Sequence, residues 1–391
     1  MLATEAVAGS IIRWLMTDAR KVASPDQFLE AFAKRLRDAG IDVTRITTGV
    51  PMLHPQIASF SGLWQLGKGV SERQFRLGGR LEVLLNSPIN IAYHGGGPVR
   101  CRMTGPPRDD EFPIVKDLRA EGFMDYLVLA LPFADGSHKA LSLATHRPAG
   151  FDAGDIAVFE ALVPAFAFNL EIQALRRTAR TLLDTYVGRQ AGGRVLDGQI
   201  QRGMGESIRA VIWLCDLRGF TRLSERLSRD ALIEMLNQYF GPMCDAVENA
   251  GGEVLKFIGD AMLAIFPVQD DAASPCRKAL EAAASARAAL ANTNRVRAAA
   301  DLPPIDYGIA LHVGEVMYGN IGGEARLDFT VIGPAVNLTA RIESLCGELH
   351  EQLLLSADFA RTAGIATEEV GIFALDGVAE KQRVFAPADH P

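Results

Sequence analysis

Two aspartates, Asp216 and Asp260, are spaced so that their carboxylates could act together on a cation. Asp216 follows the apolar run VIWLC, which predicts a buried strand, and Asp260 lies in the turn of EVLKFIGDAMLAIFP, which predicts a hairpin. If these strands pair in one sheet, the two carboxylates repel each other unless a cation lies between them. Mg²⁺ suits such a site because it needs few protein carboxylates and accepts phosphate oxygens. For either aspartate alone, a strand that runs out into solvent is the simpler explanation.

The segment directly after Asp216 has the composition of a phosphate-binding loop. Its glycine lets backbone amides approach a phosphate closely, and the helix predicted to start nearby adds its positive end. Together with the two aspartates, this predicts a nucleoside triphosphate site. The candidate substrate-binding residues are Leu217, Arg218, Gly219, Phe220 and Thr221.

A third stretch, DFTVIGPAVNLTARIES, runs from a predicted strand through Gly-Pro into a predicted helix. Asn337 and Arg341 are four residues apart on that helix and therefore share one face. Either residue alone could simply face solvent, so the significance of the pair depends on the other segments.

Taken together, four stretches resemble the catalytic domain of class III nucleotidyl cyclases: LCDLRGFTRLS, GGEVLKFIGDAMLAIF, HVGEVMYGNIG and DFTVIGPAVNLTARIE. The resemblance covers roughly residues 205 to 387 with the motifs in the right order. It implies an α+β, ferredoxin-like domain whose mixed sheet is flanked by helices. It also implies a homodimer, since the active site of this family forms between two chains.

The resemblance implies roles for four of the candidate catalytic and metal-binding residues. Asp216 and Asp260 match the two metal-binding aspartates, which would hold two divalent ions, Mg²⁺ or Mn²⁺, per site. Asn337 matches the residue that orients the ribose. Arg341 matches the residue that stabilises the charge developing on the α-phosphate.

Lys256 and Thr330 match the two positions that read the base. A Lys ammonium complements adenine N1, a Thr hydroxyl complements the exocyclic amine, and guanine reverses both. ATP is therefore the expected substrate and 3′,5′-cyclic AMP the expected product. Many adenylate cyclases have Asp where this chain has Thr330, and the threonine resembles a bacterial-type branch. Asp328 is a competing match, but only Thr330 lies seven residues before Asn337.

The basic residue expected to contact the terminal phosphates is Lys381 or Arg383.

Three alternative functions differ from an adenylate cyclase in the residues they require. A catalytically weak nucleotide-binding regulatory module would lack one or more of the six matched residues, and all six are present. A guanylate cyclase would have a carboxylate in place of Lys256. A diguanylate cyclase would need Gly-Gly-Asp/Glu-Glu-Phe, whereas the Gly-Gly pairs here continue as GGEVL and GGEAR.

The elements that must position these residues divide the chain into three regions. Residues 1–152 mix helix and strand patterns, with a helix at 25–40 and a strand pair around Ala-Asp-Gly-Ser. They resemble an α/β GAF-type sensor domain of unknown ligand or partner. Residues 153–190 predict a helical signalling linker, or coiled-coil stalk, ended by Gly188, Gly192 and Gly193. Residues 191–391 are the catalytic domain. The linker seam is Ala165, Phe168, Ile172, Leu175, Ala179, Leu182 and Tyr186.

The composition of the chain indicates its partners and its cellular compartment. Its 391 residues carry 40 basic and 47 acidic side chains, a net charge of −7, without a polybasic run, so nucleic acid is not an expected partner. Five cysteines without a Cys-x-x-Cys pair indicate reduced thiols. No export signal and no membrane span are expected. These features predict a cytoplasmic protein.

Overall fold

The computed structural model describes residues 2–22, 24–51, 57–76, 85–324 and 326–388. The chain forms two compact units, Met1–Leu182 and Leu183–Pro391. All five cysteines are free thiols, and three of them are buried.

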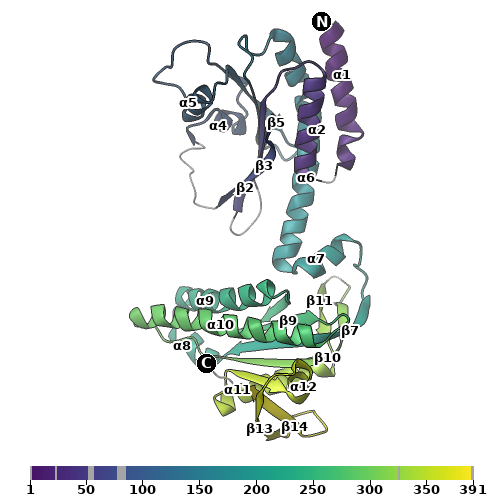
Figure 1. The fold of residues 1–391 in the computed structure, drawn as a ribbon, viewed down its shortest axis with the longest axis vertical. Coiled ribbons are helices and arrows are strands. Elements are labelled where there is room, and N and C mark those ends of the chain that lie inside the picture. The colour runs from purple at the N-terminus through teal and green to yellow at the C-terminus, as the bar shows by residue number, and fades with distance from the viewer. Residues whose placement is uncertain (1, 23, 52–56, 77–84, 325, 389–391) are drawn as a thin grey trace. The chain divides into compact units, whose positions relative to one another are not determined.

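The first unit is built on an antiparallel sheet of order β3-β2-β1-β6-β5-β4. Helices α1, α2 and α6 cover one face and enclose the larger apolar core, whereas α4 and α5 cover the other face (Figure 1). The strands are β1 (Arg45–Pro51), β2 (Ile57–Gln65), β3 (Gly69–Arg76), β4 (Val99–Arg102), β5 (Asp125–Pro132) and β6 (His138–Thr145). The helices are α1 (Leu2–Met16), α2 (Pro25–Asp38), α4 (Pro88–Tyr93), α5 (Pro113–Ala120) and α6 (Ala153–Tyr186).

The predicted helix at 25–40 is confirmed as α2. Ser24 caps it by accepting a hydrogen bond from the Gln27 amide, and Gly40 follows the helix with a positive φ of 86°. The predicted strand pair around Ala-Asp-Gly-Ser is confirmed as β5 and β6. The resemblance of this unit to a GAF-type domain remains a prediction.

Helix α6 has one buried and one exposed apolar stripe. Val158, Phe159, Leu162, Phe166 and Leu170 lie in the core of the first unit. The stripe predicted as a seam includes exposed side chains, namely Phe168, Leu175 and Tyr186. By length and composition α6 is the one helix within the described ranges that could cross a membrane, although half of its apolar window is buried.

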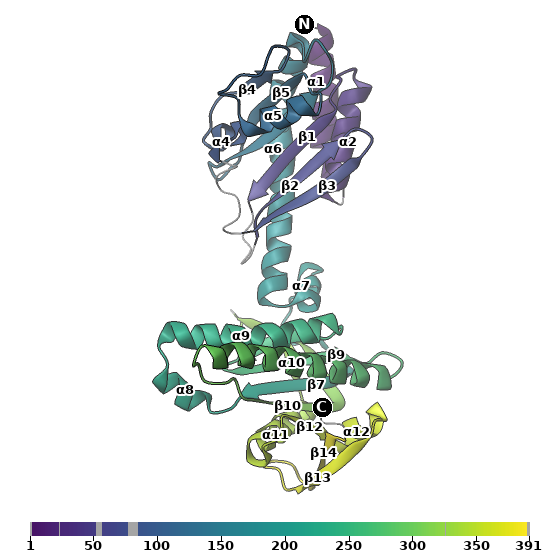
Figure 2. The ribbon, with the colours of Figure 1, turned by 60° about the vertical axis from the view of Figure 1, so that its left-hand side comes forward.

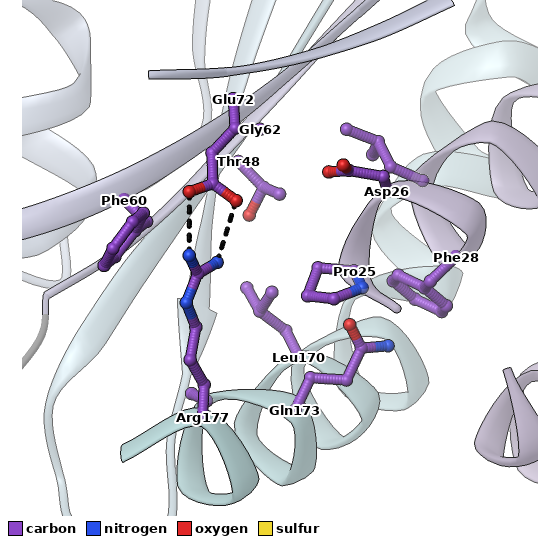
Figure 3. A pocket seen from close by; sticks show the side chains of 12 residues that line it. Pro25, Asp26, Phe28, Thr48, Phe60, Gly62, Glu72, Leu170, Gln173 and Arg177 are labelled. Carbon is purple, nitrogen blue, oxygen red and sulfur yellow. Dashed lines mark hydrogen bonds and ion pairs between the residues drawn. The ribbon is translucent and has the colours of Figure 1, made fainter. Parts of the chain in front are cut away.

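Arg177 fastens α6 to the sheet of the first unit. Its guanidinium donates two hydrogen bonds to the Glu72 carboxylate, at 2.7 and 3.0 Å, and stacks over the ring of Phe60 (Figure 3). Bidentate pairs of this kind fix orientation as well as distance. The middle of α6 is therefore held against β2 and β3.

The second unit has a mixed sheet of order β13-β14-β12-β10-β7-β9-β8, with β11 paired to β10. Helices α9, α10 and α12 enclose the core on one face, and α7 and α11 pack on the other. Figure 2 shows α9 and α10 side by side along the sheet. The strands are β7 (Gly205–Leu217), β8 (Glu253–Ile258), β9 (Ala261–Pro267), β10 (Tyr307–Gly322), β11 (Leu327–Ile332), β12 (Leu353–Ser356), β13 (Thr367–Phe373) and β14 (Gln382–Pro387). The helices are α7 (Arg189–Leu196), α8 (Phe220–Arg226), α9 (Arg229–Asn249), α10 (Ala273–Ala299), α11 (Pro334–Leu349) and α12 (Ala357–Ala363). The predicted mixed sheet with flanking helices is confirmed.

The prediction that Gly188, Gly192 and Gly193 all terminate the linker helix was partly wrong. The chain breaks at Gly188, where φ is 94°, but Gly192 and Gly193 lie inside the next helix, α7. A Cβ at Gly192 would lie only 3.1 Å from the side chain and backbone of Leu183. Close packing of α7 against the end of α6 thus requires a residue without a side chain at this position.

Candidate active site

Strands β7, β8 and β9 bring Asp216 and Asp260 together. Strand β7 pairs with β9 up to Cys215 opposite Met262, and the β8–β9 hairpin turns immediately beyond, through Gly259 and Asp260. The turn needs a glycine because φ at Gly259 is 67°, a value suited to a two-residue hairpin. The end of β7 and the tip of the hairpin therefore meet at one edge of the sheet, as the sequence predicted.

The two carboxyl groups interact directly. Burial, followed by the hydrogen bond and charge of Asp260, raises the pKa of Asp216 to about 7. Asp216 also accepts a hydrogen bond of 2.9 Å from the Leu217 amide. An uncompensated pair of this kind fits a divalent cation, because Mg²⁺ takes one or two carboxylates and completes its shell with water and phosphate oxygens.

Arg218 holds the loop after Asp216 in place. The Arg218 guanidinium donates to the Glu351 carbonyl and lies 3.6 Å from the Asp306 carboxylate, while its amide donates to the Asp306 carbonyl. The side chain of Arg218 is thus tied to the protein. Gly219 takes a φ of 68° and no atom lies within 4 Å of its Cβ position, so the backbone is open to a ligand at this point.

A bulge in β8 aims Lys256 across the sheet. Val254 pairs with Ala264 and Lys256 with Leu263, so Leu255 is the extra residue. The Lys256 ammonium donates to the carboxylate of Asp328 on β11. Asp328 was noted in the sequence only as a competing match for Thr330.

Thr330 lies two residues after Asp328 and shares its face of β11. It is 5% exposed, and its hydroxyl has no hydrogen-bond partner among the residues that the structure describes. A buried hydroxyl without a partner carries a desolvation penalty, which a bound ligand could remove. Lys256, Asp328 and Thr330 together form a polar group on one surface.

Asn337 and Arg341 lie on α11, which the sequence predicted. Both side chains are exposed and occupy one face of the helix, and Arg341 donates from Nε to the Asp376 carbonyl at 3.1 Å. Across the described part of the chain, no hydrogen bond or ion pair joins Asp216 or Asp260 to Lys256, Thr330, Asn337 or Arg341. Within a single chain, the two aspartates therefore form one group. The four other candidates are not joined to that group by any of the contacts described.

Sequence reasoning missed Glu343. This residue lies on α11 next to Gly308, the β10 partner of Asp216, and a Cβ at Gly308 would come within 2.8 Å of its Oε1. Burial raises the pKa of Glu343 to about 7, and the charges of Asp216 and Asp260 add to the rise. No local pattern pointed to it, because a residue two positions from Arg341 on a helix does not share its face.

Two further residues of the cyclase sheet, His312 and Cys215, are structural. His312 is buried in β10, where its Nδ1 lies 2.8 Å from the Ser356 hydroxyl, and burial lowers its pKa to about 4. Cys215 is fully buried, and burial raises its pKa to about 11. Neither has the character of a base or a metal ligand.

Residues 206–385 match the family model of the adenylate and guanylate cyclase catalytic domain. This segment, the cyclase domain, is therefore similar to the catalytic domains of adenylate and guanylate cyclases. The cyclase domain is 37% identical over 166 residues to an adenylate cyclase of Anabaena cylindrica, a match that covers 41% of this chain and 32% of the relative. The chain thus spans about a third of the length of that relative.

Two solved structures also resemble the cyclase domain. The adenylyl cyclase CyaB from P. aeruginosa is 26% identical with a TM-score of 0.45, covering 48% of this chain and 97% of that one. The guanylyl cyclase Cya2 is 33% identical with a TM-score of 0.42, covering 46% and 92%. Because the family model includes both adenylate and guanylate cyclases, the choice of base depends on this chain's own residues.

Proposed function

We propose that this chain is an adenylate cyclase that converts ATP to 3′,5′-cyclic AMP and pyrophosphate. The observation that carries the proposal is the meeting of Asp216 and Asp260 at one sheet edge inside a cyclase domain. These two residues would hold two divalent ions, Mg²⁺ or Mn²⁺. Such ions lower the pKa of the ribose 3′-hydroxyl and neutralise the phosphates of the leaving group.

The other residues act on the remaining parts of ATP. The 3′-oxygen attacks the α-phosphorus, the bond to the bridging oxygen of the β-phosphate breaks, and pyrophosphate leaves. Asn337 orients the ribose, and Arg341 stabilises the negative charge that develops on the α-phosphate. The open backbone at Gly219, within the Leu217–Thr221 segment, approaches the phosphates.

Adenine recognition is supported by the polar group on β8 and β11. Lys256 keeps further N–H donors for adenine N1 while it donates to Asp328, and the unpartnered Thr330 hydroxyl accepts from the exocyclic amine. Guanine would present its N1–H to the Lys256 ammonium, so a donor would face a donor. These contacts favour ATP over the alternative of a guanylate cyclase.

A homodimer is supported by exposed apolar side chains on the same strands. Phe257 and Ile258 are 53% and 54% exposed, and Met317 and Ile332, a cross-strand pair on β10 and β11, are 47% and 49% exposed. A second copy of the chain would cover these residues and supply Asn337 and Arg341 to the aspartates. The exposed stripe of α6 offers a parallel contact, through which we propose that the N-terminal unit regulates activity. The five free thiols favour a cytoplasmic setting.

The decisive experiment is an assay of the purified chain with ATP or GTP, each with Mg²⁺ or Mn²⁺, measuring cyclic nucleotide and pyrophosphate. We expect turnover of ATP and little turnover of GTP. A site that depends on hydrogen bonds rejects a mismatched partner by up to about 10⁴-fold, so Lys256→Glu should lose most ATP activity. Lys278→Glu, the same charge reversal on an exposed residue of α10, is the control. Similar kcat/KM for ATP and GTP would refute the adenine assignment, and no cyclic product from either would refute the cyclase proposal.

A further inference from the structure

The first unit contains a polar cavity of about 520 Å³ on the sheet face that also carries α4 and α5. Its walls include Arg45 on β1, Lys68 and Arg73 from the β2–β3 hairpin, Glu121 and Phe123 before β5, and His146 after β6. The volume lies within the range that proteins use for small molecules.

Arg45 is fixed in this cavity by its backbone. Strand β1 lies between two partners, with Arg45 opposite Gln65 on β2 and opposite Ala144 on β6. The preceding residue, Thr44, is also tied, because its amide and hydroxyl both donate to the Ala144 carbonyl. The backbone of Arg45 is therefore fixed, and its side chain leaves the sheet on the face that carries the cavity.

The side chain of Arg45 is partly buried, and one of its donors is enclosed without a partner. Its Nε is buried and unsatisfied, and the side chain makes no hydrogen bond or ion pair with any residue that the structure describes. Native proteins seldom leave buried polar groups unpaired, so an unsatisfied Nε in the wall of a cavity indicates a missing ligand.

The charges around Arg45 define what that ligand must be. Lys68 and Arg73 form no ion pair within the described ranges, and Glu121 is the one acidic residue among the described walls of the cavity. Burial is the largest effect on Arg45 and lowers its pKa. The charges of Tyr126 and Glu121 partly oppose this, and the Arg73 guanidinium adds a smaller lowering of that pKa. Exposed lysine and arginine side chains alone are usually a solvated rim. A partly buried arginine whose enclosed Nε has no partner differs from such a rim.

We propose that this cavity binds a small anion through a carboxylate or phosphate group held by Arg45. Guanidinium groups bind both kinds of oxyanion in a planar, two-point geometry. Lys68 and Arg73 close over the anion from the hairpin. Phe123, whose ring lies 3.9 Å from that of His146 between centroids, supplies an apolar surface for the rest of the ligand.

The test uses the full chain in metal-free Tris–chloride buffer, so that the cyclase domain lacks the ions its nucleotide site requires. Inorganic phosphate and succinate are titrated separately by calorimetry and by thermal melting, with sodium chloride matching the ionic strength. We expect saturable binding of at least one anion, and the two titrations distinguish a phosphate ligand from a carboxylate ligand. Arg45→Gln and Arg73→Gln should each weaken that binding at least tenfold. Arg13→Gln, which removes an exposed arginine from α1, should leave it unchanged.

Stability without ligand provides a second, independent measurement. If the cavity is a binding site, Arg45→Gln in anion-free buffer should melt at or above the temperature of the unmodified chain, because a buried charge without a partner is removed. If Arg45 only supports the fold, the variant should melt lower. Equal anion binding by all variants, or no saturable binding of either anion, would overturn the proposal without affecting the cyclase assignment.

Discussion

Asp216 and Asp260 place two negative charges at one point of the sheet, which costs stability until a cation is bound. This loss of folding stability grows as the pH rises. The pKa of Asp216 in the fold is about 7, raised by burial and by Asp260, whereas in the unfolded chain it returns to its ordinary value near 3.8. Below the ordinary value both states are protonated. As pH rises from there to 7 the unfolded state loses its proton first, so the fold is progressively destabilised.

Asp216→Asn should therefore stabilise the metal-free protein at pH 8. The replacement removes one of the repelling charges, with a gain on the order of 1–2 kcal/mol after solvent screening, or roughly 2–6 °C in the melting temperature of the second unit. Near pH 5 the gain should be smaller, because Asp216 is then largely protonated. Thermal melting in metal-free buffer at both pH values measures this.

The same variant should lose its response to metal. Mg²⁺ or Mn²⁺ should raise the melting temperature of the unmodified chain more at pH 8 than at pH 5, because protons compete for the carboxylates. It should leave Asp216→Asn nearly unchanged, and cyclase activity should be lost. An equal metal-induced shift in both proteins would contradict the assignment of Asp216 as a ligand.

At the scale of elements, α7 is coupled to the strand that carries Lys256. The Glu253 carboxylate at the start of β8 is 4% exposed and accepts hydrogen bonds from the Ala191 amide at 3.1 Å and the Tyr318 hydroxyl at 2.7 Å. Arg194, also on α7, stacks over Tyr318 with 4.8 Å between guanidinium carbon and ring centroid. The helix α7 is thus bonded to the sheet three residues before Lys256, the lysine proposed to read the base.

Glu253→Ala should release α7 locally. It leaves the Ala191 amide and the Tyr318 hydroxyl without an acceptor, at a cost of about 1–3 kcal/mol for each group. Hydrogen exchange of the Ala191 amide should accelerate about 10-fold or more, and base selectivity should weaken because β8 loses an anchor. Glu206→Gln, which removes only the exposed ion-pair partner of Arg194, is the control. Unchanged exchange at Ala191 in Glu253→Ala would show that other contacts hold α7.

The elements of the candidate site could be predicted because each has a local cause. Short runs of mostly apolar residues specify β8 and β9, Gly259 specifies their turn, and Gly333-Pro334 specifies the start of α11. What could not be predicted depends on contacts between distant residues. Lys256 and Asp328 are 72 residues apart, and no local pattern reveals that a bulge at Leu255 points one toward the other. The error at Gly192 has the same origin, since close packing against Leu183 overrides the usual preference of glycine for helix ends.

For the whole molecule, the proposed chemistry requires more than one chain. The aspartate pair and the exposed face of Asn337 and Arg341 have no mutual hydrogen bond or ion pair in the part of the chain described. If two copies are related by a two-fold axis, each of the two equivalent sites takes its aspartates from one copy and its α11 residues from the other.

This arrangement predicts complementation between two inactive variants. Asp216→Ala removes a metal ligand from both sites of a homodimer, and Arg341→Ala removes the charge-stabilising donor from both, so each homodimer should be nearly inactive. In a heterodimer one site collects both changes and the other is intact. Random pairing makes about half of the dimers mixed, each with one intact site of two, so activity should recover to roughly a quarter of the unmodified level.

The quarter applies to the unfractionated mixture. Co-expression of the two variants with different affinity tags, followed by sequential purification, isolates the heterodimers, in which one site of two is intact, so their activity should be roughly half of the unmodified level. A matched control pairs Asp216→Ala with Asp260→Ala. Both changes lie in the same half-site, so every site in that heterodimer lacks one aspartate and no activity should return. Recovery with Arg341→Ala but not with Asp260→Ala would assign the aspartates and Arg341 to different chains. Verified heterodimers that stay inactive in both cases would place the whole site within one chain, and Asn337 and Arg341 would then have to reach the aspartates by a movement of α11 rather than from a partner.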